Sequence, residues 1–259
     1  MNDTIHRDGL KPGDVAVVTG AAQGLGRGIA RRLAAEGARI AVWDIDQAMA
    51  AETVEMCEQA GAEARFFATD VADADAVSRS AEAVMAAWGV PYALVNNAGI
   101  HPRAPALDME LELWNKVIGI NLTGAFLCAR AFGRAMGDQG RGSVVNLASG
   151  RALQGAVKGA HYAASKAGII SLTKTLALEW APSGIRVNCV IPGVADTRQP
   201  LEDENLTPEK LKALGANIPL GRIGHADDIG GLVAFFLGPD AAYMTGQAVA
   251  INGGRLMVP

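Results

Sequence analysis

The stretch VAVVTGAAQGLG, residues 15–26, decides the fold of this 259-residue chain. It begins with a short apolar run, which is typical of a buried strand in a parallel sheet. Apolar residues at helical spacing follow, at Leu25, Ile29 and Leu33. A glycine-rich turn between a strand and a helix lets the backbone approach a phosphate group, which then lies at the helix N-terminus. The stretch therefore predicts a phosphate-binding turn, to which we assign Gly20, Gln23, Gly24, Leu25 and Gly26.

The same alternation of strand and helix continues along the chain. We expect strands at 15–20, 39–44, 63–70, 92–99, 142–149, 185–193 and 247–253, and helical stretches at 24–38, 46–60, 73–88, 108–137, 160–181 and 226–237. Strands that alternate with helices pair in parallel through right-handed crossovers. The pattern predicts an α/β fold: a single-domain doubly wound (Rossmann) parallel sheet of about seven strands with helices on both faces.

The domain boundaries follow from composition. Residues 1–12 are polar and charged, so we expect a flexible leader, and residues 13–259 form a single Rossmann-fold domain without an internal linker. The segment at about 194–224 breaks the rhythm, because it is polar and has no strand. Segments of this length between a strand and a helix often close over an active site. We expect a substrate lid, and a plain surface insertion is the alternative.

Charge and cysteine content limit the classes of partner. The net charge of -4 gives no reason to expect nucleic acid or an anionic membrane. No apolar run approaches the length of a membrane span. The three cysteines, Cys57, Cys128 and Cys189, are far apart in the sequence, which is typical of reduced thiols in a cytoplasmic protein. We expect a small-molecule substrate and no metal.

The second strand ends in an acidic residue, Asp44. A carboxylate at this place accepts hydrogen bonds from both ribose hydroxyls of an adenosine and repels a 2′-phosphate. No Arg or Lys stands at 45 or 46, and Gln23 rather than a basic residue precedes Gly24, so the pattern favours NAD over NADP. Asp70 ends the third strand and is placed to accept from the adenine amino group. The alternative is that these residues only cap helices: Asp44 or Asp46 would cap the helix at 46–60, and Asp70 the helix at 73–88.

The stretch HYAASK, residues 161–166, places Tyr162 and Lys166 four residues apart. Such residues share one face of a helix. An ammonium group close to a phenol stabilises the phenolate and lowers the phenol pKa. Ser149 ends the fifth strand, and strand carboxyl ends face the ligand crevice in this architecture. A Tyr–Lys pair is common by chance, but its occurrence together with Ser149, Asp44 and the glycine-rich turn predicts an active site.

Taken together, these motifs make the sequence resemble the short-chain dehydrogenase/reductase family, in its standard-length NAD(P)-binding branch. The resemblance covers about residues 13–254, nearly the whole chain. Its motifs occur in family order and spacing: Thr19 to Gly26, Asp44, Asp70-Val71, Asn96 to Gly99, Asn121, Ser149, Tyr162 with Lys166, and the run from Pro192 to Thr197.

The resemblance implies a role for each matching residue. Tyr162 is implied to be the general base in alcohol oxidation, and Lys166 to lower its pKa and hold the nicotinamide ribose. Ser149 is implied to orient the substrate oxygen, and Asn121 to hold a water in a proton relay or to kink its helix. The implied cofactor contacts are the glycine-rich turn, Asp44, Asp70, Val71, Asn97, Ala98, Gly99, Tyr162, Lys166, Pro192, Gly193, Val194 and Thr197.

The substrate is not implied by the resemblance, because that part of the pocket varies in the family. Basic side chains occur where the pocket is expected: His101, Arg103, Arg151, Lys158, His161 and Arg198. Arg binds carboxylate, phosphate or sulfonate through two parallel hydrogen bonds. We therefore expect a polar substrate, a sugar or polyol, with an acidic or sulfonated sugar as one option. The expected contacts are His101, Arg103, Ser149, Arg151 and Tyr162. The alternative is that these basic groups are solvated or lie at a subunit contact.

Three functions compete at this point. The first is an NAD-dependent dehydrogenase of a polar secondary alcohol. The second is a 3-oxoacyl or ketone reductase, which Asp44 disfavours because reductive synthesis usually uses NADP. The third is a non-catalytic protein that binds a dinucleotide to sense redox state, which the presence of Tyr162 and Lys166 disfavours.

The apolar tail RLMVP, at 255–259, follows Asn252 where many family members have an acidic residue. In the family such tails often pack in a subunit interface, so we expect a homotetramer. The tail either reaches a neighbouring active site or frays.

Overall fold

Seven parallel strands form the central sheet, in the order β3-β2-β1-β4-β5-β6-β7. The computed structural model that shows them describes residues 8–196 and 207–257. The strands are β1 (Val15–Thr19), β2 (Arg39–Asp44), β3 (Ala64–Ala68), β4 (Ala93–Asn96), β5 (Gly142–Leu147), β6 (Ile185–Pro192) and β7 (Ala248–Ile251). The chain starts in the middle of the sheet and builds outward in both directions. The doubly wound parallel sheet that the sequence predicts is thereby confirmed.

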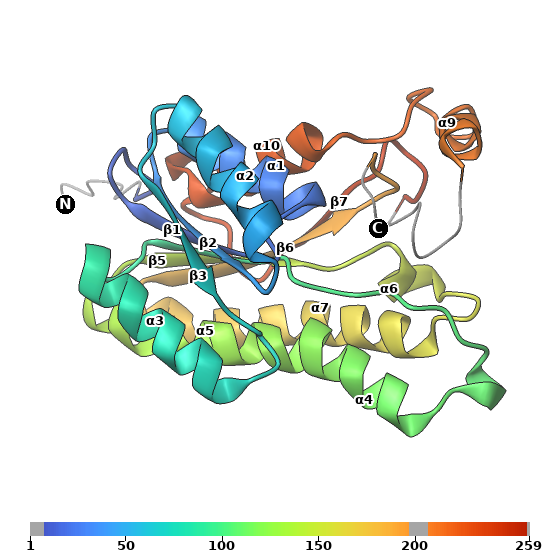
Figure 1. Cartoon of the computed structure of the whole chain (residues 1–259), viewed down its shortest axis with the longest axis horizontal. Helices are drawn as coiled ribbons and strands as arrows, with labels where there is room; N and C mark the ends of the chain where they lie inside the picture. Colours follow the sequence, from blue (N-terminus) through green and yellow to red (C-terminus); the bar gives the residue numbers. More distant parts are fainter. Residues whose placement is uncertain (1–7, 197–206, 258–259) are drawn as a thin grey trace.

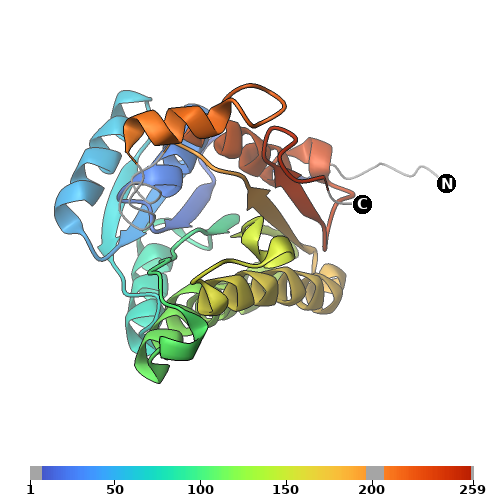
Figure 2. The ribbon, with the colours of Figure 1, turned by 90° about the vertical axis from the view of Figure 1, so that its right-hand side faces the viewer.

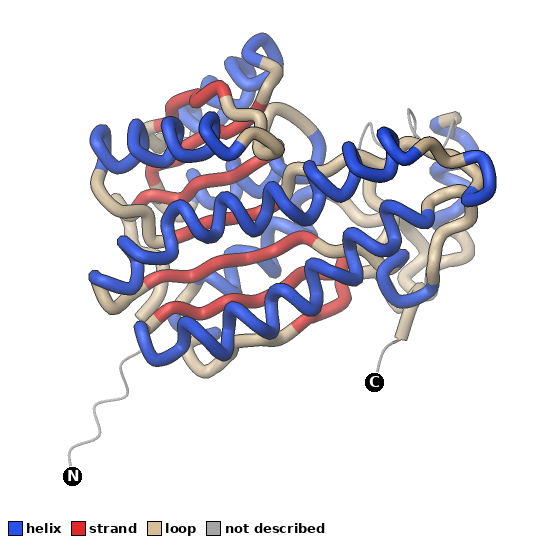
Figure 3. Tube along the Cα trace, turned by 90° about the horizontal axis from the view of Figure 1, so that it is seen from below, coloured by secondary structure: helices blue, strands red, loops and turns tan. Residues whose placement is uncertain are grey.

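Helices cover both faces of the sheet (Figure 1). One face carries α1 (Gly24–Ala35), α2 (Gln47–Gln59) and α10 (Ala226–Leu237), and the other carries α3 (Ala74–Trp88), α4 (Leu111–Ile118), α5 (Gly124–Asp138) and α7 (Ala160–Trp180). Figure 3 views the second face, where the long helices run along the strands. Two short helices, α6 (Arg151–Gln154) and α9 (Pro208–Gly215), lie at the end of the molecule where the strands finish.

The two-sided cover explains why the strands are continuous apolar runs. Every residue of β1 and of β5 is buried, since neither face of the sheet meets solvent there. Toward α1 and α10 the core is built around Ile29 and Phe236. Toward α3, α5 and α7 it is built around Trp43 and Phe132, whose ring centroids lie 5.5 Å apart. Apolar burial on both faces fixes the sheet, and therefore fixes where the strand ends meet.

A crevice is expected where the winding direction changes. The strand order turns at β1, because β2 lies on one side of it and β4 on the other. The loops that follow β1 and β4 therefore diverge, and ligands bind in the gap outside the carboxyl ends of such strands. Figure 2 looks at this end of the molecule, with α9 on the side of α1 and α2, and α6 on the side of α7.

The two peripheral segments differ in how far the structure describes them. Residues 1–7 of the expected leader lie outside the described residues, while residues 8–12 contact the domain rather than extend from it. The Leu10 N–H donates to the Leu237 carbonyl oxygen at 2.8 Å, and Asp8 pairs with Arg141 at 3.1 Å. These bonds hold residues 8–12 in place, although their polar composition predicted a flexible segment. Residues 8–12 therefore lie against the domain, and the expected flexible leader stays a prediction.

The expected lid is described at both ends but not between 197 and 206. Its helix α9 begins at Pro208, which occupies the first turn, and the Thr207 hydroxyl caps the Lys210 N–H at 3.3 Å. A single β-bridge between Ala195 and Gly224 joins the two ends of the segment. A role in closing over substrate stays a prediction.

Among the described residues, no helix combines the length and the apolar character needed to cross a membrane.

Candidate active site

The glycine-rich turn after β1 is packed so closely that side chains are excluded. Gly20 has a φ of +64°, a conformation that favours glycine. A Cβ placed on Gly26 would lie 2.1 Å from the Gly20 carbonyl oxygen and 2.6 Å from the Asn97 amide nitrogen. The turn therefore presents bare backbone at the N-terminus of α1, which is the arrangement that a pyrophosphate requires.

The loop after β4 braces this turn from the side. The Thr19 hydroxyl accepts the backbone N–H groups of Asn97 and Ala98, at 3.0 and 3.1 Å. The Asn97 side-chain amide donates to the carbonyl oxygens of Thr19 and Gly20, both at 3.0 Å. These bonds join the ends of β1 and β4 on the two sides of the crevice. Asn97 and Ala98 thus lie at the cleft and also hold its shape.

The acidic residues at the strand ends line the cleft, and others cap the helices. One Asp44 oxygen accepts the Ala22 N–H of the glycine-rich turn at 2.9 Å. Asp46, not Asp44, caps α2, and Asp73, not Asp70, caps α3. The helix-cap alternative is therefore confirmed at Asp46 and wrong for Asp44 and Asp70.

Tyr162 and Lys166 project together from α7, as their spacing predicts. The Lys166 ammonium lies 5.8 Å from the centre of the Tyr162 ring and donates to the Leu147 carbonyl oxygen at 2.8 Å. Burial lowers the pKa of Lys166 from 10.5 to about 8. Ser149 follows β5, and its hydroxyl accepts the Arg151 N–H at 3.2 Å.

Asn121 lies in a π-helical turn, Gly119–Thr123, between α4 and α5. Its side-chain oxygen accepts the Ile100 N–H at 2.9 Å, and its amide donates to the Ile100 carbonyl at 3.0 Å and to the Ser165 hydroxyl at 3.2 Å. The wider turn lets the side chain reach across to the loop after β4. A Cβ on Gly99 would lie 3.3 Å from Asn121 Oδ1 and 3.4 Å from Lys166 Nζ. Gly99 is thus the point where the two side chains meet the loop.

These elements enclose one elongated cleft of about 440 Å³. Its lining includes the predicted residues Gly20, Gln23, Gly24, Leu25, Asp44, Asp70, Val71, Asn97, Ala98, Gly99, Tyr162, Lys166 and Pro192. Sequence reasoning missed Ile45, Asp46, Thr69, Ile100, Ile120, Leu147 and Ala148, which also line it. Lys166 is the single cation among the described lining residues. A bare glycine turn and a buried ammonium that line the same cleft fit a dinucleotide.

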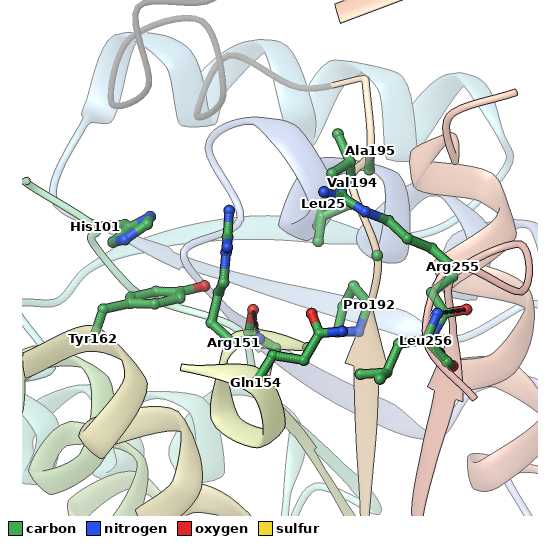
Figure 4. A pocket seen from close by; sticks show the side chains of 14 residues that line it. Leu25, His101, Arg151, Gln154, Tyr162, Pro192, Val194, Ala195, Arg255 and Leu256 are labelled. Atoms are coloured by element: carbon green, nitrogen blue, oxygen red, sulfur yellow. Dashed lines mark hydrogen bonds between the residues drawn. The ribbon is translucent and has the colours of Figure 1, made fainter. Parts of the chain in front are cut away.

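A second compartment adjoins the first at Tyr162 and Pro192 (Figure 4). It is lined by Leu25, His101, Ser149, Gly150, Arg151, Gln154, Tyr162, Pro192, Gly193, Val194, Ala195, Asn252, Arg255 and Leu256. The predicted substrate contacts His101, Ser149, Arg151 and Tyr162 are brought together here. Gln154 and the C-terminal residues Asn252, Arg255 and Leu256 were missed, although the unusual tail composition was a signal.

The other basic candidates lie elsewhere. Arg103 is exposed and donates to the Val157 carbonyl oxygen at 3.3 Å, so the expectation that it lines the compartment is not met. After His101 the chain pairs with the loop before α7, where the Ala104 N–H donates to the Lys158 carbonyl oxygen at 2.9 Å, and Arg103 lines neither compartment. His161 is fully buried in α7, and its Nδ1 accepts the Tyr162 N–H at 2.7 Å. Lys158 is exposed on the loop before α7, while Thr197 and Arg198 lie outside the described residues.

His101 is the neighbour that covers the Tyr162 ring. The two ring centroids lie 3.9 Å apart, and both residues are at least nine-tenths buried. Tyr162 is therefore fixed by α7 below and by a stacked imidazole beside it.

Within residues 8–196 and 207–257, no group of three or more His, Cys, Asp or Glu side chains is arranged to hold a metal ion.

A doubly wound sheet, a bare glycine turn and a buried Tyr–Lys pair in the same crevice define a dinucleotide-binding oxidoreductase. The sequence model of a family described as enoyl-(acyl carrier protein) reductase matches residues 20–255. The chain belongs to the short-chain dehydrogenase/reductase family, whose members are NAD(P)-dependent oxidoreductases, and its named relatives include dehydrogenases that act on hydroxyl groups.

The relatives differ in what they act on. The chain is 40% identical over 253 residues to (3R)-3-hydroxyacyl-CoA dehydrogenase of Rattus norvegicus, with 94% of this chain and 96% of the relative covered. It is 38% identical over 244 residues to L-rhamnose 1-dehydrogenase (NAD(P)(+)) of Azotobacter vinelandii, with 92% and 94% covered. The crystal structure of levodione reductase superposes with a TM-score of 0.90 at 32% identity, with 95% and 98% covered. Membership of the family therefore defines the reaction class and leaves the substrate open.

Proposed function

We propose that this protein is an NAD-dependent dehydrogenase that acts on a secondary alcohol of a sugar or polyol with a negatively charged group. The observation that carries the proposal is the position of Arg151, whose side chain extends into the compartment beside Tyr162 (Figure 4). Gln154 adds a polar amide to the same wall. A guanidinium next to the reacting groups suits a hydroxylated, anionic substrate better than a hydrocarbon one.

The residues of the first cleft are the proposed cofactor site. The backbone of residues 20–26 would hold the pyrophosphate, and Asp44 the adenosine ribose. Asp70 and Val71 would contact the adenine, and Tyr162 and Lys166 the ribose at the reacting end. Pro192, Gly193 and Val194 would contact the nicotinamide; Thr197, which the family resemblance adds to this set, lies outside the described residues. When bound, the oxidised nicotinamide accepts a hydride from the carbinol carbon.

The protein's own part in the reaction is proton transfer. We assign Tyr162 as the base that takes the hydroxyl proton at its phenolic oxygen, and Ser149 as the hydroxyl that orients the substrate oxygen. The Lys166 ammonium favours the phenolate through its positive charge. Asn121 holds the backbone at Ile100 next to Lys166, which supports a positioning role in the proton relay.

The preference for NAD rests on charge in the cleft. Asp44 lies where a 2′-phosphate would approach, and Ile45 and Asp46 follow it. Arg27, the nearest cation on α1, is engaged by the Ala22 carbonyl oxygen and by Glu52 at 2.9 Å. A phosphate at this place would meet two carboxylates.

A second candidate is the oxidation of a 3-hydroxyacyl thioester. It is favoured by the similarity to the rat 3-hydroxyacyl-CoA dehydrogenase and by apolar residues of the second compartment, including Leu25, Val194 and Leu256. The arginines of the second compartment, Arg151 and Arg255, favour the sugar acid instead, because the acyl chain of a thioester carries no charge to pair with them.

The test is NADH formation, followed by absorbance, with neutral sugars, polyols, uronic and sulfonated sugars and a 3-hydroxyacyl thioester. We expect turnover with NAD and an acidic sugar. Oxidation of the thioester alone would overturn the sugar proposal. Tyr162→Phe should lower kcat about 10²–10⁴-fold while NADH binding is retained. Unchanged turnover in that variant would contradict the mechanism.

We further propose that the protein is a cytoplasmic homotetramer. The three cysteines are buried and separate, which suits a reducing compartment. Large apolar side chains are exposed on α4, α7 and the segment after α10, including Leu111, Leu178 and Tyr243. Light scattering on the purified protein tests the assembly, and a monomer mass would contradict it.

A further inference from the structure

We infer that the C-terminal turn, residues 252–256, is a recognition element for the charged end of the substrate, in which Arg255 completes an anion site with Arg151. This inference rests on the proposed function and names the group that the site binds: a carboxylate, sulfonate or phosphate on a hydroxylated carbon chain. Figure 4 shows the two arginines entering one compartment from different elements. Arg151 rises from α6 beside Tyr162, and Arg255 reaches from the opposite wall toward Val194.

Asn252 holds the turn in the shape that directs Arg255. Its side-chain amide donates to the Leu256 carbonyl oxygen at 2.8 Å, and its oxygen accepts the N–H groups of Gly254 at 3.0 Å and of Leu256 at 3.4 Å. One amide thus closes the turn from both sides of Arg255. A carboxylate in place of this amide could accept but not donate, so the bond to the Leu256 carbonyl oxygen would be lost.

The turn is also fixed by its surroundings. Gly253 and Gly254 have φ values of +65° and +87°, a conformation that favours glycine. A Cβ on Gly253 would lie 2.6 Å from Ile218, which follows α9, so no larger residue fits there. On the other side, Leu256 lies close to Gly150, the residue before α6. A Cβ added to Gly150 would be 3.6 Å from the Leu256 side chain. The turn that carries Arg255 therefore lies beside the start of α6, which carries Arg151.

The charge of the compartment suits an anion. Its described lining has two guanidinium groups and no Asp or Glu side chain. The neutral Asn252 matters here as well, because a carboxylate at that position would stand three residues from Arg255 and cancel part of its charge. Guanidinium groups bind planar or tetrahedral oxyanions through paired hydrogen bonds. Asn252 is therefore a positioning residue for Arg255 in two ways, through geometry and through its lack of charge.

The arrangement also predicts which substrates react. The carbinol is oxidised at Tyr162 and Ser149, and Arg255 lies on the other wall of the compartment. A substrate oxidised at Tyr162 whose anionic group also reaches Arg255 must carry that group away from the oxidised carbon, with Arg151 meeting it from the Tyr162 side. Sugars with the charge at the far end should be better substrates than 2-hydroxy acids, in which the two groups are adjacent.

The experiment compares glucose derivatives that differ at carbon 6: the carboxylate, the sulfonate, the phosphate and the neutral 6-deoxy sugar. Arg255→Gln is expected to lower kcat/KM for the preferred anionic sugar by about 10–100-fold, the range of a charged hydrogen bond, and to leave the neutral sugar within about twofold. Asn252→Asp is expected to act in the same direction. Arg79→Gln, an exposed arginine on α3, is the matched control. Equal loss for charged and neutral sugars would overturn the inference.

Calorimetry separates this inference from the proposed function. Binding of the same four sugars to the protein with NADH is measured without turnover. If no sugar is oxidised but an anionic one binds in wild type and not in Arg255→Gln, the anion site stands and the proposed reaction fails. If anionic and neutral sugars bind equally, or no anionic sugar binds, the anion site is refuted. The preferred anion identifies which of the three head groups the site takes.

Discussion

His101 and Tyr162 lie face to face, with ring centroids 3.9 Å apart and ring planes inclined by 26°. The pair joins two elements that are distant in sequence, the loop after β4 and the first turn of α7. The phenol that we assign as the base is thus held on one face by an imidazole. Stacked rings of this kind contribute about 0.5–1.5 kcal/mol beyond the area that they bury.

The stack predicts that two substitutions of His101 differ in their effect on kcat. His101→Phe keeps a flat ring against Tyr162, so kcat is expected to stay within about threefold, whereas His101→Ala frees the phenol and is expected to lower kcat by about 3–10-fold. Steady-state kinetics with the best substrate of the panel measure both. An equal loss in the two variants would show that a ring nitrogen, rather than the stacking, is what the site needs.

Gly26→Ala tests the close packing of the phosphate turn. The new Cβ would meet the Gly20 carbonyl oxygen at 2.1 Å, so the backbone must shift. We expect a loss of about 1–3 kcal/mol in the free energy of unfolding and a weaker affinity for NADH. Urea denaturation and a fluorescence titration with NADH give the two quantities.

The matched control for this change is Gly231→Ala. It lies in α10, where the added Cβ would have ordinary contact with Arg32 at 3.5 Å, so the free energy of unfolding should stay the same or rise by up to about 1 kcal/mol, and NADH binding should stay close to wild type. Normal NADH affinity in Gly26→Ala would contradict the role of the bare turn.

The sheet and the cofactor cleft were predictable from the sequence because both depend on local pattern. A strand buried on both faces must be a continuous apolar run, and β1 and β5 are such runs. Asp44 was found because it ends a strand, and strand ends meet at one edge. Tyr162 and Lys166 were found because a helix repeat brings them together without any tertiary information.

The substrate compartment was less predictable because it is built by short and irregular segments. The helix α6 is four residues long, too short for a periodic pattern, yet it orients Arg151 and Gln154. Arg103 and Arg255 are both basic residues in loops, and nothing local shows that the first points outward and the second inward. The turn that carries Arg255 is held by side-chain bonds of Asn252, the residue after β7, and a periodic pattern does not reveal such bonds.

Asp44 is expected to set the cofactor preference. Asp44→Asn removes the charge that would repel a 2′-phosphate, so the ratio of kcat/KM for NAD to that for NADP should fall by about 10–100-fold, the effect of a charged hydrogen bond. Kinetics with both cofactors at one substrate concentration measure the ratio. Asp73→Asn is the control of equal charge change, because this residue caps α3, does not line the cleft, and Asn also caps helices. A similar fall in both variants would mean that general charge, rather than Asp44 itself, selects the cofactor.

The buried ammonium of Lys166 predicts how stability changes with pH. Its pKa is about 8 in the folded protein against 10.5 ordinarily, because burial disfavours the charged form. Between these values the unfolded chain binds more protons than the folded one, so this lysine makes the folded protein more stable as pH rises from 8 to 10.5. Below pH 8 both states are protonated, and the cost of burying the charge is present in full.

Lys166→Met removes this cost, so the difference in unfolding free energy, variant minus wild type, should be largest below pH 8. It should decline by about 3 kcal/mol by pH 10.5, which is the free energy equivalent of the lowered pKa. The lost bond to the Leu147 carbonyl shifts the difference at every pH and does not change its slope. Urea denaturation of the two proteins without cofactor, at pH 7 and above pH 10, measures it, and Lys174→Met on the exposed face of α7 gives the background for losing a lysine. A difference that does not vary with pH would show that the ammonium is not desolvated, and the cation that we place beside Tyr162 would then act through hydrated charge instead.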